Sequence, residues 1–254
     1  MTDRSPYAVE TTTTSLDILE RLVEAETAVG VTRLASDLDL SKSVVHNHLS
    51  TLRSLGYVVK RRQKYRPSLR TLMLGEQTRE SIPVYEKGRT KVENLADATG
   101  EIVTLFVLEE NRGVPVCLAR GTDEWTPAYR TGERMPLHVN APGKAILSTF
   151  PSARVDALLD EGSLAAPTEQ TVTDSDELKA ALRKIRNDGI ALCREEQFPG
   201  IVGVSAPING LDDGRAAALG VVGPVDRLNG RYLEEDLTGQ VVSTTKSIEL
   251  ALTA

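Results

Sequence analysis

Two histidines one residue apart are the first residues in this sequence whose spacing could do chemistry. His46 and His48 lie in SKSVVHNHLSTLRSLGYVVKRRQKYR, residues 41–66, which contains no Asp or Glu. Such a segment can hold a metal ion, take part in catalysis or face a negatively charged partner. On a helix, side chains two positions apart point about 200° apart, so these imidazoles cannot bind one ion together. We predict no metal site and no cofactor, with His48 hydrogen-bonded at the edge of the core and His46 on the outer face.

The distribution of charge favours the negatively charged partner. The chain has 254 residues, of which 30 are basic and 36 acidic, and its net charge is −6. Residues 41–70 contain eight basic residues and no acidic one, so the rest of the chain carries −14. A basic segment on an acidic body is typical of a surface that binds nucleic acid, because the body itself repels phosphates. The alternative is a basic face that meets only solvent.

Residues 41–56 are predicted to form a recognition helix. Ser41 is a good N-cap, 42–55 is the body, and Gly56 stands where a left-handed residue is needed to end the helix. The inner face of the helix holds Val45, Leu49 and Leu52, flanked by Val44, His48 and Leu55. The opposite face holds Ser43, His46, Asn47, Ser50, Arg53 and Ser54.

Contacts with bases are expected from the first two turns of this helix in the major groove. Asn47 can pair with adenine through two hydrogen bonds, and His46 can donate one to guanine. Lys42 and Ser43 lie at the helix N-terminus, where backbone N–H groups favour a phosphate. Phosphate contacts position a protein on DNA and base contacts specify the sequence. We therefore expect Lys42 and Ser43 to position the helix, and His46 and Asn47 to read the bases.

The flanking segments complete a predicted winged helix-turn-helix. A first helix over 15–26, capped by Thr14, brings together Leu16, Leu19, Leu22 and Val23, and a second helix begins at Thr32. After the recognition helix, YVVKR and KYRP predict a hairpin that turns at residues 62–63 and reaches the minor groove or the DNA backbone. Further DNA contacts are expected from Thr32, Lys60, Arg61, Arg62, Lys64 and Arg66.

The fold class predicted for the whole chain is α+β. We expect a flexible tail at 1–13, the winged helix-turn-helix at 14–67, linker or dimerisation helices at 68–99 and a sheet domain at 100–254. In the linker, Pro83 begins a helix that Gly100 stops. The predicted strands of the last domain are IVTLFVLEE, VPVCLAR, IALCREE, GVSAPIN and AAALGVVG. Its predicted helices are APGKAILSTF, RVDALLD, DSDELKAALRKIRNDG and LEEDLTGQVVSTTKSIELALTA.

The cysteine spacing and the hydropathy of the sequence indicate in which cellular compartment the protein acts. Cys117 and Cys193 lie far apart, match no zinc spacing and indicate no disulfide framework. The sequence has neither an apolar run of 18 residues nor a secretory signal at its start, so we expect a cytoplasmic protein with no membrane partner.

Gly143 and Lys144 resemble part of a phosphate loop. His138 and Ala145 stand where that loop needs Gly and Ser or Thr, so we predict no nucleotide hydrolysis. The helix end at 142–143 could still accept a ligand carboxylate through free N–H groups. A tight strand-to-helix turn is the alternative explanation of the same glycine.

Four segments in order resemble the IclR-type transcriptional regulators from about residue 14 onward. They are SKSVVHNHLSTLRSLGYV with the basic wing and YRPSLRTLMLG, then RMPLHVNAPGKAIL, GIVGVSAPI and AAALGVVGP. The resemblance implies a winged helix-turn-helix, a linker helix and a C-terminal GAF-like domain with an antiparallel sheet flanked by helices. It also implies a regulator that binds a palindromic operator in double-stranded DNA as a homodimer or dimer of dimers, under the control of a small-molecule effector.

The resemblance also implies where the effector binds, between the GKA turn and the ends of the following strands. The matching positions are Trp125, Ala141, Pro142, Gly143, Cys193, Gly203, Ser205, Gly220 and Val222, with His138, Glu195 and Glu196 as polar candidates. In members that bind small oxo-acids, several of these positions hold an acid or a hydroxyl, where this chain has Cys, Gly, Gly and Val. We therefore expect an effector larger or less polar than glyoxylate, in a cavity widened by these substitutions.

Two other functions compete with regulation. A small-metabolite enzyme would need a catalytic constellation, and the only candidate is a Cys/His site from His138, Cys193 and Glu195. Cys193 lies in an aliphatic strand, where a buried and inert thiol is expected, so we predict that the protein is not an enzyme. A winged-helix subunit that binds proteins would not need the acid-free basic surface.

Overall fold

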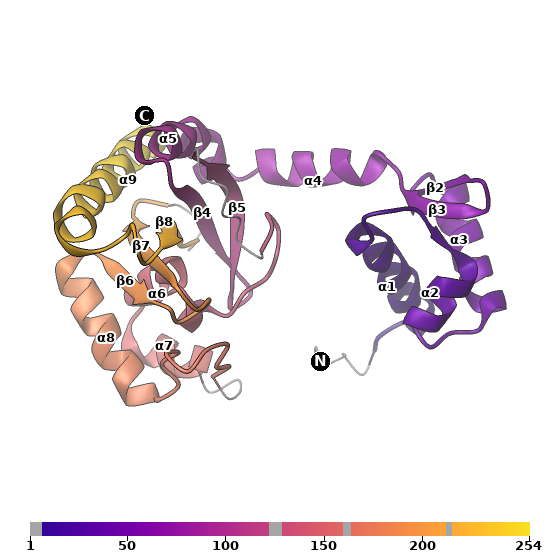
Figure 1. The fold of residues 1–254 in the computed structure, drawn as a ribbon, viewed down its shortest axis with the longest axis horizontal. Coiled ribbons are helices and arrows are strands. Elements are labelled where there is room, and N and C mark those ends of the chain that lie inside the picture. Colours follow the sequence, from indigo (N-terminus) through magenta and orange to yellow (C-terminus); the bar gives the residue numbers. More distant parts are fainter. Residues whose placement is uncertain (1–6, 122–128, 160–163, 212–214) are drawn as a thin grey trace. The chain divides into compact units, whose positions relative to one another are not determined.

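The computed structural model describes residues 7–121, 129–159, 164–211 and 215–254 (Figure 1). The chain divides into two compact units, residues 1–79 and 80–254. Among the helices of the described ranges, none combines the length and apolar character that a bilayer crossing requires.

The first unit is a winged helix-turn-helix, as predicted. Its helices are α1 (Glu10–Glu24), α2 (Val31–Asp37) and α3 (Lys42–Ser54), and its strands are β1 (Val29–Gly30), β2 (Val58–Arg61) and β3 (Lys64–Pro67). The strands form an antiparallel sheet in the order β1-β3-β2. The three helices and the sheet enclose one apolar core, whose buried members include Ile18, Leu22, Leu34, Val45, Leu49, Leu52, Val58 and Tyr65.

The prediction for α1 was wrong in its start and in part of its buried face. The helix begins at Glu10, within the segment 1–13 that was expected to be a tail. The hydroxyl group of Thr14 donates to the Glu10 carbonyl oxygen at 2.9 Å, so this threonine lies inside the helix and does not cap it. Ile18 and Leu22 are the buried residues, whereas Leu16 and Val23 are 51% and 52% exposed.

The end signals of α3 and the hairpin turn follow the prediction. The Ser41 hydroxyl accepts a hydrogen bond from the Val44 N–H at 3.2 Å, and Gly56 has a left-handed φ of 81°. Arg62 and Gln63 both have positive φ, at 46° and 63°, as a two-residue type I′ turn requires. This turn matches the twist of the strands and presents its side chains at the hairpin tip.

Arg70 ties the start of the linker helix α4 (Arg70–Glu80) to the end of α3. Its guanidinium donates to the Leu55 carbonyl oxygen at 3.0 Å and lies 4.9 Å from the centre of the Tyr57 ring. The backbone N–H of Arg70 also donates to the Ser68 hydroxyl, which in turn donates to the Gly56 carbonyl oxygen. This basic residue therefore stabilises the junction of α3 and α4 within the first unit.

The second unit is built on a five-stranded antiparallel sheet in the order β5-β4-β8-β7-β6. Its strands are β4 (Ile102–Glu109), β5 (Arg112–Arg120), β6 (Ala191–Arg194), β7 (Ile201–Ile208) and β8 (Ala217–Pro224). Its α-helices are α5 (Pro83–Thr99), α6 (Ala141–Ser148), α7 (Ser152–Leu159), α8 (Ser175–Asp188) and α9 (Thr238–Leu252). Two short turns complete it, the 3-10 helix η1 (Leu137–Val139) and the π-helix η2 (Tyr232–Leu237).

Helices cover both faces of this sheet (Figure 1). On one face, α5 and α9 lie side by side and pack on alternate strand residues such as Leu105 and Leu219. On the other face, α6 packs against β7 and β8, with α8 outside it, and the buried strand residues include Phe106 and Ala218. The alternation along β4 places Leu105 and Phe106 in different cores, as expected of a strand buried on both sides.

Candidate functional sites

The outer face of α3 is polar and exposed, opposite a fully buried apolar stripe. Val45 and Leu49 are 0% exposed and Leu52 is 7% exposed. The exposed side chains of α3 include Lys42, Ser43, His46, Asn47, Ser50 and Arg53. Thr32, near the start of α2, is exposed as well. The helix therefore offers donors and acceptors to a partner without disturbing the core.

The two histidines have separate roles, as the helical projection predicts. The Nδ1 atom of His48 lies 2.7 Å from the hydroxyl oxygen of Ser15, so this half-buried ring joins α3 to α1. His46 is exposed on the outer face. Throughout the described residues, no group of three or more His, Cys, Asp and Glu could hold a metal ion.

The hairpin tip carries unpaired positive charge. Arg61, Arg62 and Lys64 are exposed, and none has an acidic partner among the described residues. Lys60 is half-buried, with its ammonium 5.3 Å from the centre of the Tyr65 ring, and Arg66 is exposed on β3. This charge is available to an anionic ligand such as a DNA backbone.

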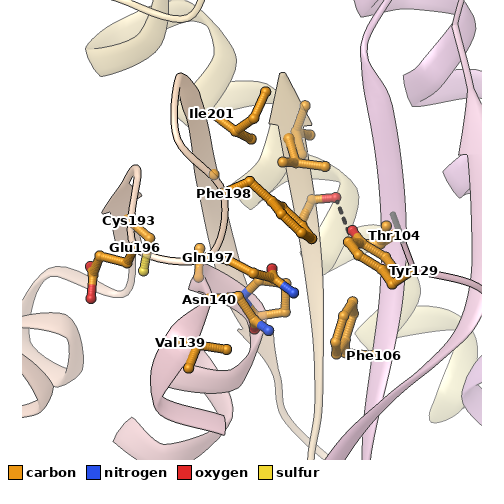
Figure 2. Close-up of a pocket in the computed structure, with 16 residues that line it drawn as sticks. Thr104, Phe106, Tyr129, Val139, Asn140, Cys193, Glu196, Gln197, Phe198 and Ile201 are labelled. Atoms are coloured by element: carbon orange, nitrogen blue, oxygen red, sulfur yellow. Dashed lines mark hydrogen bonds between the residues drawn. The ribbon is translucent and has the colours of Figure 1, made fainter. Parts of the chain in front are cut away.

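A small inner cavity of about 30 Å³ lies in the second unit, between the start of α6 and the sheet (Figure 2). Its lining residues are Thr104, Phe106, Tyr129, Val139, Asn140, Ala141, Pro142, Cys193, Glu196, Gln197, Phe198, Ile201, Gly203, Gly220, Val221 and Val222. Seven of the residues singled out from the sequence are among them: Ala141, Pro142, Cys193, Glu196, Gly203, Gly220 and Val222. Trp125 lies outside the described residues.

The glycines of the cavity do not widen it, which corrects the reason given from the sequence. A Cβ atom on Gly220 would lie 2.7 Å from the Cγ atom of Pro142, and one on Gly203 would lie 3.4 Å from the Cβ atom of Ala141. The residues at the start of α6 thus occupy the space that the glycines leave. These glycines allow the helix to approach the sheet closely, and the cavity stays small.

Of the two explanations left open by the sequence, the structure has the tight turn, and the Gly143 N–H group is not free for a ligand carboxylate. The Asn140 Oδ1 atom accepts from the Gly143 N–H at 2.8 Å, and the Asn140 carbonyl oxygen accepts from the Lys144 N–H at 3.0 Å. Pro142 has no N–H group. A Cβ atom on Gly143 would lie 2.1 Å from the Leu137 carbonyl oxygen, so only glycine fits here.

Four candidates hold the structure together and do not line the cavity: His138, Gly143, Glu195 and Ser205. The His138 Nε2 atom donates to the Ala165 carbonyl oxygen at 2.8 Å, and burial lowers the pKa of this ring, which favours its neutral form. Glu195 accepts from the Gly200 N–H, and Ser205 donates to the Leu219 carbonyl oxygen. Burial raises the pKa of the Cys193 thiol, which disfavours the thiolate that a Cys/His catalytic site would need.

A buried ion pair beside the cavity could not be predicted from the sequence. The Lys144 ammonium donates to both carboxylate oxygens of Glu196, at 2.7 Å and 2.5 Å, and the two side chains are 3% and 9% exposed. Their 52-residue separation left no local signal, although Lys144 within an otherwise apolar helix is itself unusual. The charges neutralise each other.

Aromatic rings form one wall of the cavity (Figure 2). The Tyr129 ring stacks on Phe198 with centroids 6.2 Å apart and meets the edge of Phe106 at 6.1 Å. The hydroxyl groups of Tyr129 and Thr104 are hydrogen-bonded, and burial raises the pKa of the Tyr129 phenol. A larger hollow of about 500 Å³ adjoins the cavity and shares with it Tyr129, Val139, Gln197 and Phe198.

Comparisons with known proteins agree on both units. The model of the IclR helix-turn-helix domain matches residues 13–62, and that of the bacterial transcriptional regulator IclR C-terminal domain matches residues 77–250. The probable HTH-type transcriptional regulator ArcR of Halobacterium salinarum is 26% identical over 251 residues, 97% of this chain and 95% of the relative.

Two solved structures share the fold over nearly the whole chain. A transcriptional regulator from Rhodococcus sp. RHA1 has a TM-score of 0.84 at 26% identity, covering 97% of this chain and 99% of its own. An IclR homologue from Microbacterium hydrocarbonoxydans, crystallised with 4-hydroxybenzoate, has a TM-score of 0.80 at 20% identity, covering 96% and 99%.

Proposed function

Since this chain belongs to the IclR family of bacterial transcriptional regulators, we propose that α3 and the β2–β3 hairpin contact its operator and that the inner cavity receives its effector. The protein is a DNA-binding regulator controlled by a small molecule, and not an enzyme. The acid-free basic surface of the first unit is the observation that carries the proposal for DNA. We place its action in the cytoplasm, where its DNA target lies.

The recognition surface separates base contacts from phosphate contacts. His46 and Asn47 lie in the first two turns of α3, are exposed, and have side chains suited to guanine and adenine. Thr32, Lys42 and Ser43, at or near helix starts, and the cations of the hairpin are suited to phosphates. Ser50 and Arg53 extend the exposed face toward the end of α3.

Asn47→Ala is expected to relax sequence preference at one base pair of each half-site, because the bidentate contact with adenine is lost. The penalty that the wild type shows for a wrong base at that position, about 1–3 kcal/mol, should disappear. Fluorescence anisotropy with an operator selected from a randomised library, and with its single-base variants, measures this. Ser54→Ala, at the far end of α3, is the matched control. An unchanged preference at every position would contradict the assignment of Asn47 to base reading.

The effector is proposed to be larger or less polar than glyoxylate. The supporting observation is the lining of the cavity, which is dominated by aromatic, aliphatic and glycine residues. A relative of the same fold, 20% identical, binds 4-hydroxybenzoate, which carries a carboxylate on a benzene ring and so supports the size of the effector but not its charge. A ring does not fit a volume of about 30 Å³, so binding requires the Tyr129–Phe198 stack to part and join the cavity to the adjoining hollow.

The linker helix α4 is proposed to join two copies of the chain on a palindromic operator. No residue of α4 is buried, although Leu72, Met73 and Leu74 are apolar. Leu69, just before the helix, is 79% exposed, and Leu72 and Met73 follow it at the spacing of one helical face. An exposed apolar stripe at this spacing is typical of a helix that packs on another helix.

Leu72→Gln with Met73→Gln is expected to weaken self-association at least tenfold, because the paired stripe loses its apolar contacts. Sedimentation velocity over a range of concentrations measures the dissociation constant of the dimer. Gln77→Ala, on the same helix, is the control. An unchanged dissociation constant would show that the copies associate through another surface.

A further inference from the structure

Asn140 has a buried amide N–H group without a partner. The residue is 6% exposed and lines the inner cavity, and its Nδ2 atom has no hydrogen-bond partner among the described residues. Its orientation is fixed, because Oδ1 accepts from the Gly143 N–H and an exchange of the two amide atoms would place two donors against each other. Buried donors are almost always paired, so an unpaired one beside a cavity is suited to a ligand oxygen.

The cavity offers no net positive charge to a ligand carboxylate. Among the described residues that line it, Glu196 is the only charged side chain, and Lys144 neutralises it. The thiol of Cys193 and the phenol of Tyr129 are uncharged. The N–H groups of residues 143 and 144 at the start of α6 are taken by Asn140, and Pro142 has none. An anion would therefore lose its hydration without gaining a cation or a set of free N–H groups.

The remaining walls suit a flat apolar ring. Phe106, Tyr129 and Phe198 contribute three aromatic rings, and Pro142 lies against Gly220 on the sheet side. Figure 2 shows these rings and the Asn140 side chain around the same cavity. When the Tyr129–Phe198 stack parts to admit it, a ring that packs between such walls can bring one substituent to the amide.

On the premise that this cavity is the effector site, we propose that Asn140 selects uncharged effectors. The selected class is a ring that bears an acceptor oxygen, such as the carbonyl of an amide, ketone or aldehyde. The Nδ2–H group donates to that oxygen and the aromatic walls hold the ring. Carboxylates of the same shape are rejected because the cavity supplies no compensating charge.

Calorimetric titration of the full chain with small probe molecules tests this selection, in the wild type and in variants at Asn140. Benzamide has the ring and a neutral amide carbonyl. Benzoate has the same ring but carries a charged carboxylate in place of the amide. Toluene has the ring but no oxygen atom, and glyoxylate has no ring. The wild type is expected to bind benzamide at least tenfold more tightly than the other three. Asn140→Ser keeps the N-cap but removes the amide, and should weaken benzamide roughly tenfold while leaving toluene unchanged.

Asn140→Asp is expected to change the relative affinities for benzamide and aniline, which a purely structural role of Asn140 would leave unchanged. Aspartate keeps the acceptor for the Gly143 N–H and replaces the donor with an oxygen atom. Benzamide affinity is expected to fall by roughly tenfold to a hundredfold, while aniline, which carries N–H donors, gains affinity. The exchange of preference distinguishes a contact with the ligand from a loss of stability.

The outcomes separate this inference from the proposed effector site. Gly203→Val, which places an isopropyl group beside Ala141 at the cavity, should abolish benzamide binding; unchanged DNA affinity and an unchanged circular dichroism spectrum would show that the fold survives. If benzamide binding is lost in that variant but unaffected by both Asn140 variants, the cavity is the site and the role of Asn140 is wrong. Wild-type binding of benzoate or glyoxylate as tight as that of benzamide also overturns the selection. If benzamide binding survives Gly203→Val, or no probe binds, the assignment of this cavity fails.

Discussion

Replacing Arg61, Arg62 and Lys64 together with glutamine is expected to weaken operator binding on the order of a hundredfold at physiological salt. The three side chains are exposed at the hairpin tip without acidic partners among the described residues, so each is available to a phosphate. If each neutralises one phosphate, the slope of log affinity against log salt should become shallower by about 2.7. Fluorescence anisotropy at several salt concentrations measures both quantities.

Glutamine is the appropriate replacement because the hairpin turn should survive it. Gln63 already occupies a left-handed position in this turn, with φ of 63°, beside Arg62 at 46°. The control removes the same charge from exposed positions of the second unit, Arg89, Arg183 and Lys184. Affinity and slope that match the wild type in the hairpin variant would remove the wing from the DNA interface and favour a winged helix that binds protein.

Lys144→Met is expected to destabilise the second unit by about 3–5 kcal/mol. The replacement leaves the Glu196 carboxylate buried beside the cavity without its ammonium partner. Removing one member of a buried ion pair is costly because the remaining charge has lost its water and gained nothing in return. Urea unfolding followed by circular dichroism measures the free energy of unfolding.

The double variant Lys144→Met with Glu196→Leu should recover most of this loss. Two apolar side chains of similar volume remove the uncompensated charge, and such exchanges are often close to neutral in stability. The interaction energy from the full cycle of single and double variants isolates the pair. Equal unfolding midpoints for the wild type and the Lys144 variant would mean that the carboxylate finds another partner.

Local signals made much of the first unit predictable from sequence. Ser41 and Gly56 mark the two ends of α3, and the basic hairpin turns at residues 62–63, because caps and tight turns depend on residues close in the chain. The start of α1 failed for a local reason as well. A run of threonines resembles a polar tail, but the hydroxyl of Thr14 bonds to the helix backbone within its own turn.

The inner cavity was less predictable because its shape depends on residues far apart in the sequence. Gly203 and Gly220 suggested open space, and only the fold shows that Ala141 and Pro142 fill it. Asn140 was overlooked because an asparagine before a helix is ordinarily only a cap. Its second amide atom acquires a role only when the sheet closes over it.

The contacts of Arg70 connect the linker helix α4 to the end of α3. Because the guanidinium is bonded to the Leu55 carbonyl oxygen and stacked on Tyr57, the first turn of α4 is clamped to the end of α3. Arg70→Ala is therefore expected to loosen the connection between α4 and α3, because both contacts are lost.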